Sequence, residues 1–245
     1  MRIAIAGGTG QAGAQAARAA RERGHEVTLL ARSEGVDLIS GAGARDALEG
    51  ADAVIDASGV RPGDDPTAFH EAVIRTLTTA RPPLIVVLSI VNCDRASEYP
   101  LYGGKLAQER AVEKSGVPFT IARTTQFHEF AAQVYRMGTR GPLHFSPRMR
   151  TQPVAVREVG AHLVDLAEAA PAGRAADLGG PREESLLDMV RGYARASGAG
   201  RLVFPINLGG AFGGAQRDGS LLPGPDALRG TETFSEWLAR VFPAR

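Results

Sequence analysis

Short, mostly apolar runs alternate with helix-like segments from the start of the chain. Residues 2–6 and 27–31 are such runs, and they predict two buried strands. Residues 14–23 are rich in Ala and Arg and contain neither Gly nor Pro, so we expect a helix that ends at Gly24. A strand, a helix and a second strand in this order predict a βαβ unit with parallel strands.

The same alternation continues through most of the chain. Residues 84–89 are continuously apolar up to Ser89, which predicts a strand buried on both faces. Residues 51–59 predict a strand that runs into a turn of small residues, and a further strand is expected at 119–123. Weaker patterns indicate strands at residues 36–39, 152–156 and 202–206. Helices are expected at residues 41–50, 66–80, 105–115, 157–169, 183–197 and 231–241, and one that begins within 124–128. Residues 207–229 are rich in Gly and Pro, which predicts a loop.

This order of elements predicts an α/β fold, a Rossmann-type doubly wound parallel sheet with a smaller C-terminal substrate lobe. A length of 245 residues suits one large α/β domain, and no obvious linker divides it. We expect residues 1–140 to serve mainly nucleotide binding and residues 141–245 to form mainly the substrate lobe.

The turn between the first strand and the first helix reads Gly7-Gly8-Thr9-Gly10-Gln11-Ala12-Gly13. Gly7 permits a sharp turn, Gly10 leaves room for a pyrophosphate at the helix N-terminus, and Gly13 lets the helix lie close to the sheet. This context predicts a dinucleotide site with contacts from Gly7, Thr9, Gly10, Gln11, Ala12 and Gly13. The alternative is a glycine-rich turn that binds no ligand.

The end of the second strand indicates which dinucleotide is bound. An acidic residue there would accept a hydrogen bond from a ribose 2′-hydroxyl, whereas this chain has Arg32 and Ser33. A guanidinium and a hydroxyl suit a 2′-phosphate, so we expect NADP(H) as the cofactor; the alternative is a surface arginine without a ligand. Ala57, Ser58 and Gly59 follow another expected strand and would leave room for adenine and ribose.

Composition limits the other classes of function. Hydrophobic residues at 44%, charged residues at 22% and a formal net charge of +1 give no reason to expect nucleic acid or a membrane as a partner. Cys93 is the single cysteine and has no evident activating partner, and no spacing of His, Asp or Glu indicates a metal. Without a membrane-length apolar run or a signal peptide, we expect a cytoplasmic monomer or homodimer with a small-molecule substrate.

Six features carry a family resemblance: GGTGQAG, ARS, DAVIDASG, VVLSIV, a Tyr-x-x-Lys helix start and ARTTQFHEF. Together they resemble the atypical short-chain dehydrogenases/reductases. More narrowly, they are similar to the NAD(P)-binding, NmrA-like group that includes isoflavone-reductase-type enzymes. The resemblance covers nearly the whole chain. It implies an NADPH reductase, an epimerase-like enzyme or a nucleotide-sensing regulator.

A departure from the family pattern affects the expected proton chemistry. The family usually has Tyr-x-x-x-Lys on one helix and a Ser at the end of the preceding strand, where the Lys holds the nicotinamide ribose and lowers the Tyr pKa. This chain has Lys105 and Ser89, but Leu101 stands where the Tyr is usual, and Tyr102 lies three residues before the Lys. Three interpretations are open: Tyr102 is a shifted proton donor, Lys105 is the acid or base, or Lys105 only holds the ribose.

Segments at the ends of two strands complete the expected site. Further cofactor contacts are expected from Ser89, Lys105 and Thr124. Asn92 either hydrogen-bonds the substrate or caps a turn. The resemblance implies that the nicotinamide and the substrate are bordered by Gln126, Phe127 and His128. His128 is an alternative proton donor, although a lone histidine is more often structural.

We therefore expect an NADPH-dependent oxidoreductase that transfers hydride to or from a small organic carbonyl, imine or activated C=C substrate. The first alternative is a non-catalytic NADP(H)-sensing regulator, which the missing tyrosine favours. The second is a nucleotide-bound isomerase, dehydratase or cyclase whose reaction is not a redox reaction.

Overall fold

The chain forms two compact units in the computed structural model, which describes residues 1–141, 143–199 and 202–243. Unit 1 consists of Met1–Arg123 and Val156–Ala176, and unit 2 consists of Thr124–Ala155 and Asp177–Arg245. The chain crosses into unit 2 after Arg123 and returns to unit 1 at Val156, so each unit is built from two stretches of sequence. The expected division of function at residue 140 stays a prediction.

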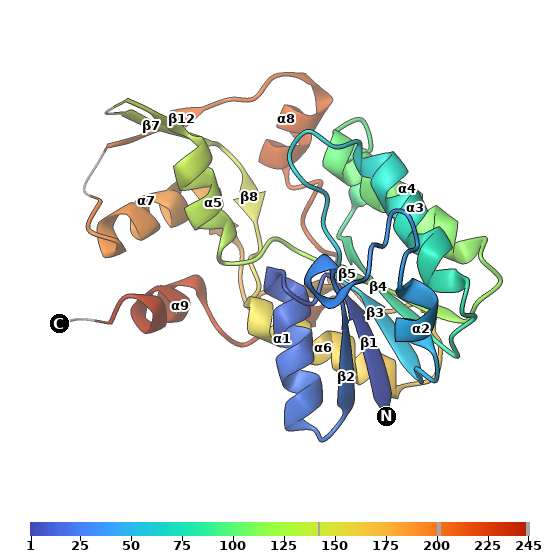
Figure 1. Ribbon diagram of the computed structural model, residues 1–245. Coiled ribbons are helices and arrows are strands. Elements are labelled where there is room, and N and C mark those ends of the chain that lie inside the picture. The colour runs from blue at the N-terminus through green and yellow to red at the C-terminus, as the bar shows by residue number, and fades with distance from the viewer. Residues whose placement is uncertain (142, 200–201, 244–245) are drawn as a thin grey trace. The chain divides into compact units, whose positions relative to one another are not determined.

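A sheet with parallel strand pairs forms the centre of unit 1 (Figure 1). Its strands are β1 (Arg2–Ala6), β2 (Glu26–Leu30), β3 (Ala53–Asp56), β4 (Ile85–Ile90) and β5 (Phe119–Thr124), in the spatial order β2-β1-β3-β4-β5. The short β9 (Gly173–Arg174) pairs with β5. The direction of winding reverses between β1 and β3, and sheets of this kind bind ligands at the carboxyl ends of the strands at such a point. The expected Rossmann-type fold is confirmed.

Helices cover both faces of this sheet, as Figure 1 shows. On one face α1 (Gln11–Glu22) packs against α6 (Val156–Glu168). On the other face α3 (Pro66–Thr78) packs against α4 (Pro100–Glu113), beside the short α2 (Ala44–Leu48). Gly160 permits the close approach of α6 to α1, since a Cβ at this position would lie 2.5 Å from the backbone carbonyl carbon of Gln15.

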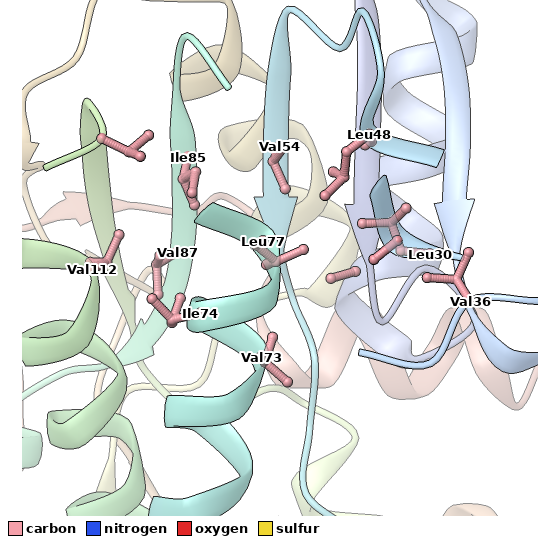
Figure 2. Packing of buried hydrophobic residues seen from close by; sticks show 14 of the residues in the cluster. Leu30, Val36, Leu48, Val54, Val73, Ile74, Leu77, Ile85, Val87 and Val112 are labelled. Atoms are coloured by element: carbon pink, nitrogen blue, oxygen red, sulfur yellow. The ribbon is translucent and has the colours of Figure 1, made fainter. Parts of the chain in front are cut away.

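The core of unit 1 includes a cluster between the sheet and the helices α2, α3 and α4 (Figure 2). It joins apolar strand side chains to apolar helix side chains, among them Val54, Ile85, Val87, Val73, Ile74 and Leu77. The central strands are apolar on both faces because helices cover both. Each large side chain in this cluster contributes strongly, and truncation of the fully buried Leu77 to Ala costs about 2–5 kcal/mol.

The strand expected at residues 36–39 is wrong. Val36 does pack into the core, but the chain then turns at Asp37 instead of extending. The carboxylate of Asp37 accepts a hydrogen bond from the Ile39 N–H at 2.9 Å, and the Asp37 N–H donates to the Ala42 carbonyl at 2.9 Å. An aspartate that bonds the backbone two residues on favours a turn over a strand.

Unit 2 combines short strands with helices. The helices are α5 (Phe130–Met137), α7 (Leu186–Ala196), α8 (Gly210–Asp218) and α9 (Phe234–Val241). One sheet has the order β12-β7-β6, made of β12 (Val203–Ile206), β7 (Leu143–Pro147) and β6 (Thr139–Arg140). Two further pairs are β8 (Arg150–Thr151) with β11 (Glu184–Ser185), and β10 (Leu178–Gly179) with β13 (Leu228–Arg229). The edge strand expected at residues 202–206 is confirmed for residues 203–206.

Three other expectations need correction. The segment 207–229, expected to be a loop, contains α8. The helix expected to begin within residues 124–128 begins at Phe130, because Phe127 first pairs with Val154 in a parallel bridge. That bridge is the strand-like part of residues 152–156. The helix that carries Lys105 begins earlier than expected, at Pro100, whose ring suits a first helical position.

No helix in the described part of the chain combines the length and the apolar character that crossing a bilayer requires. Within the same residues, no group of three or more His, Cys, Asp or Glu side chains is placed to hold a metal ion.

Candidate functional site

The turn between β1 and α1 has a shape that depends on its glycines. Gly7 has a φ of +71°, in the left-handed region, and a Cβ there would lie 2.5 Å from the Ala57 carbonyl oxygen. A Cβ on Gly13 would collide with the carbonyl oxygen of Gly7. The Gly10 N–H donates to the same oxygen at 2.8 Å and closes the turn. A larger side chain at Gly7 or Gly13 would therefore displace the turn.

The first turn of α1 directs backbone N–H groups toward the end of the helix. The first bond within the helix runs from the Ala14 N–H to the Gly10 carbonyl at 2.9 Å. The N–H groups of Gln11, Ala12 and Gly13 precede it and have no acceptor within the helix. The first turn also lacks an acidic residue that would offset the positive end of the helix dipole. This arrangement suits a pyrophosphate.

The segment after β3 lies against the glycine turn. A Cβ on Gly7 would lie 2.7 Å from the Ser58 Cα, so little space separates the two segments. The carboxylate of Asp56 accepts the Ser58 N–H at 3.0 Å and holds the segment in place. The Ser58 hydroxyl is buried, and no described residue hydrogen-bonds its Oγ. Buried hydroxyls normally have a partner, so the site fits a polar ligand such as a nucleotide coenzyme.

Arg32 and Ser33 are exposed directly after β2, in the short 3₁₀ helix η1 (Arg32–Glu34). β2 pairs in register with β1, with Leu30 opposite Ala6, so both residues follow a strand end next to the glycine turn. Among the described residues, the Arg32 guanidinium has no hydrogen-bond or ion-pair partner, and it is available to a ligand. The predicted contact with a 2′-phosphate stays a prediction.

Lys105 is buried against the ends of β3 and β4. Its Nζ donates to the Leu88 carbonyl at 2.9 Å and to Oε1 of Gln108 at 2.9 Å. Nε2 of Gln108 in turn donates to Oδ2 of Asp56 at 2.6 Å. These bonds connect α4 to the ends of both strands, and one N–H of the ammonium remains beyond the two bonds to the protein.

The surroundings of Lys105 change its acidity. Burial lowers the pKa of Lys105 to about 8, although the Asp56 carboxylate opposes this shift. The imidazole of His70 is fully buried nearby, and burial, followed by the charge of Lys105, lowers its pKa to about 2. His70 is therefore neutral at physiological pH, whereas Lys105 changes charge a little above it.

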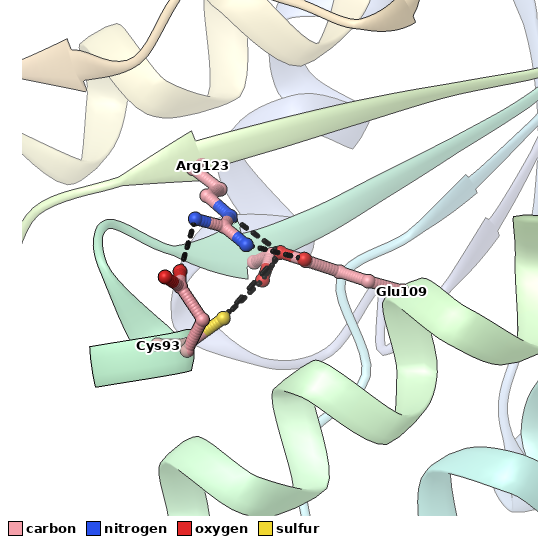
Figure 3. A network of polar contacts seen from close by, with 5 residues as sticks. Cys93, Glu109 and Arg123 are labelled. Atoms are coloured by element: carbon pink, nitrogen blue, oxygen red, sulfur yellow. Dashed lines mark hydrogen bonds and ion pairs between the residues drawn. The ribbon is translucent and has the colours of Figure 1, made fainter. Parts of the chain in front are cut away.

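A second buried network joins β4, β5 and α4 (Figure 3). Nε and Nη2 of Arg123 donate to the two carboxylate oxygens of Glu109 at 2.7 and 2.6 Å, and Nη1 binds Asp94 at 2.7 Å. The Ser89 hydroxyl donates to Oε1 of Glu109 at 2.5 Å. Because Ser89 directs its proton to an internal carboxylate, this geometry disfavours Ser89 as a proton donor to a ligand.

Cys93 belongs to the edge of this network. It is fully buried, with its Sγ 3.6 Å from Oε1 of Glu109. Burial, followed by the nearby Glu109 carboxylate, raises the pKa of the Cys93 thiol to about 11. The thiol is protonated at neutral pH, which agrees with the expected unreactive side chain. Asn92, directly before it, adopts a left-handed φ of +54° and begins a 3₁₀ turn.

The first turn of α4 separates the two candidates for the family's tyrosine position. Leu101 is 39% exposed, whereas Tyr102 is 5% exposed and packs edge-on against Tyr99, with ring centroids 6.1 Å apart. A Cβ on Gly104 would lie 2.5 Å from the Pro66 side chain. The glycine here therefore lets α4 approach α3, and the helix continues through it.

The remaining expected site residues lie in unit 2. Thr124 pairs with Leu178 of β10, and Gln126 accepts a hydrogen bond from the Thr151 hydroxyl at 2.7 Å. Phe127 forms the parallel bridge described above. Their predicted contacts with cofactor and substrate stay predictions.

His128 lies in the interior of unit 2. Its Nε2 donates to the Glu232 carbonyl at 3.0 Å, and its ring lies 5.8 Å from Phe234 and 6.0 Å from Trp237, centroid to centroid. This full burial among aromatic rings favours the structural interpretation of His128 over catalysis.

The glycine turn, the segment after β3, Lys105 and Ser89 all lie in unit 1. The candidate site also contains residues that were not recognised as part of it from the sequence. The missed residues are Asp56, Gln108, Glu109 and Arg123, which hold Lys105 and Ser89 in place. Two signals were available: Asp56 and Arg123 are charged residues within apolar strands, and Gln108 and Glu109 lie three and four residues after Lys105.

Comparison with solved structures supports the fold. An NADPH-dependent quinone oxidoreductase from Escherichia coli, complexed with NADPH, matches with a TM-score of 0.75 and 18% identity over 98% of this chain and 99% of that one. Triphenylmethane reductase from Citrobacter sp., complexed with NADP(H), has a TM-score of 0.71 and 18% identity over 99% and 100% of the two chains. A nucleoside-diphosphate-sugar epimerase from Staphylococcus aureus has a TM-score of 0.70 and 12% identity over 97% and 99%.

Sequence comparison gives a partial relative and a family. The photosystem II assembly factor Ycf39 of Trieres chinensis is 29% identical over 155 residues, which are 55% of this chain and 49% of that protein, so the match spans about half of its length. The model of the NAD(P)H-binding family matches residues 7–169, which include the glycine turn, Ser58 and Lys105. This match is consistent with the resemblance to the atypical short-chain dehydrogenases/reductases, and the chain belongs to the NAD(P)H-binding family.

Proposed function

We propose that the protein is an NADPH-dependent oxidoreductase that transfers hydride to or from a small organic molecule with a carbonyl, imine or activated C=C group. The observation that carries this proposal is the glycine turn, whose free N–H groups lie next to the strand end with the exposed Arg32 and Ser33. The names of two structural neighbours, a quinone oxidoreductase and a triphenylmethane reductase with NADPH or NADP(H), support this chemistry.

The proposed cofactor contacts follow from the groups that are available. The N–H groups of residues 11–13 would hold the pyrophosphate, Arg32 and Ser33 the 2′-phosphate, and the Ser58 hydroxyl a ribose or phosphate oxygen. The remaining N–H of Lys105 would hold the nicotinamide ribose. The bound cofactor supplies or accepts the hydride, and the protein supplies binding, orientation and the proton.

The substrate would occupy an apolar pocket of about 310 Å³ in unit 1. The first turn of α4 and the segment after β3 line it, with apolar side chains from Tyr99, Leu101, Val60, Pro62 and Pro66. Arg61 and Asp64 add charged groups to the lining. Apolar walls with a few polar groups suit a small, largely apolar acceptor such as a quinone.

Two groups are candidates for the proton donor, and substitutions distinguish them. Tyr102 stands next to the family position in the sequence, and Lys105 has a pKa lowered to about 8. If Lys105 supplies or positions the proton, Tyr102→Phe keeps kcat within about twofold, while Lys105→Met lowers it by at least about 100-fold. The reverse pattern would assign the proton to Tyr102.

The experiment that tests the function is a substrate survey with purified protein. NADPH oxidation is followed by its absorbance while quinones, imines and enones are supplied. We expect one of these acceptors to be reduced with consumption of one NADPH per product. We also expect Leu101→Tyr to increase carbonyl reduction if a tyrosine at position 101, where the family usually has one, can still act in catalysis. Product formation without any loss of NADPH would contradict hydride transfer, and it would indicate the non-redox enzyme that the epimerase fold also allows.

An NADP(H)-sensing regulator is the second candidate. Two observations favour it: Leu101 replaces the usual tyrosine, and the Lys105 ammonium already has two protein acceptors at 2.9 Å. A regulator would bind NADPH, would respond to no substrate above background and would change its affinity for a protein partner with the cofactor's redox state.

A further inference from the structure

Unit 2 contains a cationic pocket that no step of the proposed reaction uses. It has a volume of about 260 Å³ and is lined by Arg148, Met149, Arg150, Ser185, Leu187 and Arg217. We propose that this pocket binds a small organic anion, in which a phosphate or carboxylate is attached to an apolar body.

Three guanidinium groups supply the positive charge: Arg148 and Arg150 lie two residues apart, just before and at the start of β8, and Arg217 lies in α8. Arg150 binds both carboxylate oxygens of Glu183 at 2.6 and 2.9 Å, which orients its planar group. Nη1 of Arg217 donates to the Leu208 carbonyl at 2.9 Å. The Arg148 guanidinium has no hydrogen-bond or ion-pair partner among the described residues. Arginine forks match the planar geometry of phosphate and carboxylate groups, so these side chains favour an anion.

The lining of the pocket is apolar as well as cationic. Met149 and Leu187 line the pocket but are only 5% and 7% exposed, so they present a small apolar area between the exposed arginines. A bare inorganic ion would leave this surface in contact with water. A ligand with an apolar body would cover it and gain binding free energy in proportion to the area buried.

The backbone holds the lining residues in a fixed arrangement. Arg150 and Ser185 are opposite residues in the antiparallel pair of β8 and β11, and the Leu186 N–H donates to the Met149 carbonyl at 2.9 Å. The Arg148 N–H donates to the Ile206 carbonyl of β12 at 2.9 Å. Because the pocket is preformed, a ligand does not have to order these segments when it binds.

The charge balance at the pocket stays positive. Of the described residues that line it, three are arginines and none is acidic. Glu183 is bonded to Arg150, and the Asp218 carboxylate, which accepts the N–H and the hydroxyl of Ser220, also lies close enough to Arg150 and Arg217 to offset part of their charge. The three arginines therefore exceed the two carboxylates by one charge. The charge of Arg148 is therefore uncompensated by a bonded carboxylate, and Arg217 is bonded only to a neutral carbonyl.

Calorimetry with simple probes tests the proposal. The result of this test does not depend on whether the protein is a reductase. Phenyl phosphate, benzoate, inorganic phosphate and phenol are titrated into the full chain. We expect phenyl phosphate or benzoate to bind at least about fivefold more tightly than inorganic phosphate and phenol, because only these two combine charge with an apolar ring.

Substitutions assign the binding to the pocket. Arg148→Ala removes a guanidinium without internal bonds and should weaken the binding of the tightest probe at least about fivefold. The double variant Arg148→Ala with Arg217→Ala should weaken the same binding at least about tenfold. Arg45→Ala removes an equal charge from an exposed position in α2, and Arg32→Asp tests binding at the nucleotide site; both should leave the probe affinity unchanged. Equal affinity in wild type and the double variant, or no binding of phenyl phosphate and benzoate, would overturn the proposal.

Discussion

Lys105 illustrates how position alone changes the chemistry of one side chain. Its ammonium lies in the interior with two protein acceptors at 2.9 Å, and burial lowers its pKa to about 8 from the usual 10.5. The folded chain therefore releases this proton at a lower pH than the unfolded chain does. Between pH 8 and 10.5 the unfolded state binds more protons, so the free energy of unfolding rises with pH over this window.

We predict that this pH dependence disappears when the lysine is replaced. In denaturation experiments between pH 7 and 10, the free energy of unfolding of the wild type should rise relative to that of Lys105→Met, by up to about 3 kcal/mol for a shift of this size. A constant difference between the two proteins over this range would show that the buried ammonium is not the titrating group.

Several elements meet at the Arg123–Glu109 ion pair, which ties the end of β5 to α4 and, through Asp94, to the segment after β4. Both side chains of the pair are 5% exposed. Loss of one partner would leave the other charged and buried, so Arg123→Met should lower the free energy of unfolding by about 3–5 kcal/mol. Urea denaturation at neutral pH measures this loss.

An exposed ion pair provides the matched control. Arg182 binds Glu184 at 2.7 Å, but its side chain is 57% exposed, so Arg182→Met should change the free energy of unfolding by less than about 1 kcal/mol. Arg123→Met with Glu109→Met should recover part of the loss, because neither buried charge of the pair is left without its partner and Asp94 is half exposed. If Arg123→Met were as stable as Arg182→Met, the pair would not join these elements energetically.

The glycine turn gives a prediction for a backbone element. A Cβ on Gly13 would meet the Gly7 carbonyl, so Gly13→Ala should destabilise the fold by about 1–3 kcal/mol and weaken NADPH binding at least about tenfold. Gly214 in α8 is the control, because a Cβ there would have no described atom within 4 Å, and Gly214→Ala should stabilise the helix by about 0.5–1 kcal/mol. Thermal melts and calorimetry of both variants check the prediction, and equal effects would contradict it.

The elements that could be predicted from the sequence are those whose signals are local. The strand, glycine turn and helix at residues 2–22 follow from adjacent residues. The bond between Gln108 and Asp56 joins residues that are 52 positions apart, and no local pattern reports which buried polar groups will meet. In α8, glycine content predicted a loop, but Gly213 allows a close local approach to the Leu208 carbonyl, and packing of α8 against β8 outweighed intrinsic propensity.

At the scale of the whole molecule, the two compact units carry different parts of the proposals. Unit 1 contains the glycine turn, Arg32, Ser58 and Lys105, and therefore every group that would bind the nicotinamide cofactor except Thr124. Unit 2 contains the cationic pocket and the residues after β5. The central claim concerns unit 1: an NADP(H) molecule binds at the glycine turn, with its 2′-phosphate at Arg32.

Calorimetric titration of the wild type and Arg32→Asp with NADPH and NADH tests this claim most directly. We predict that the wild type binds NADPH at least about tenfold more tightly than NADH and that Arg32→Asp reverses the preference, because a carboxylate repels the 2′-phosphate and accepts a ribose hydroxyl. Failure of the wild type to bind either nucleotide would contradict the site itself. An unchanged preference in Arg32→Asp would contradict the role of Arg32.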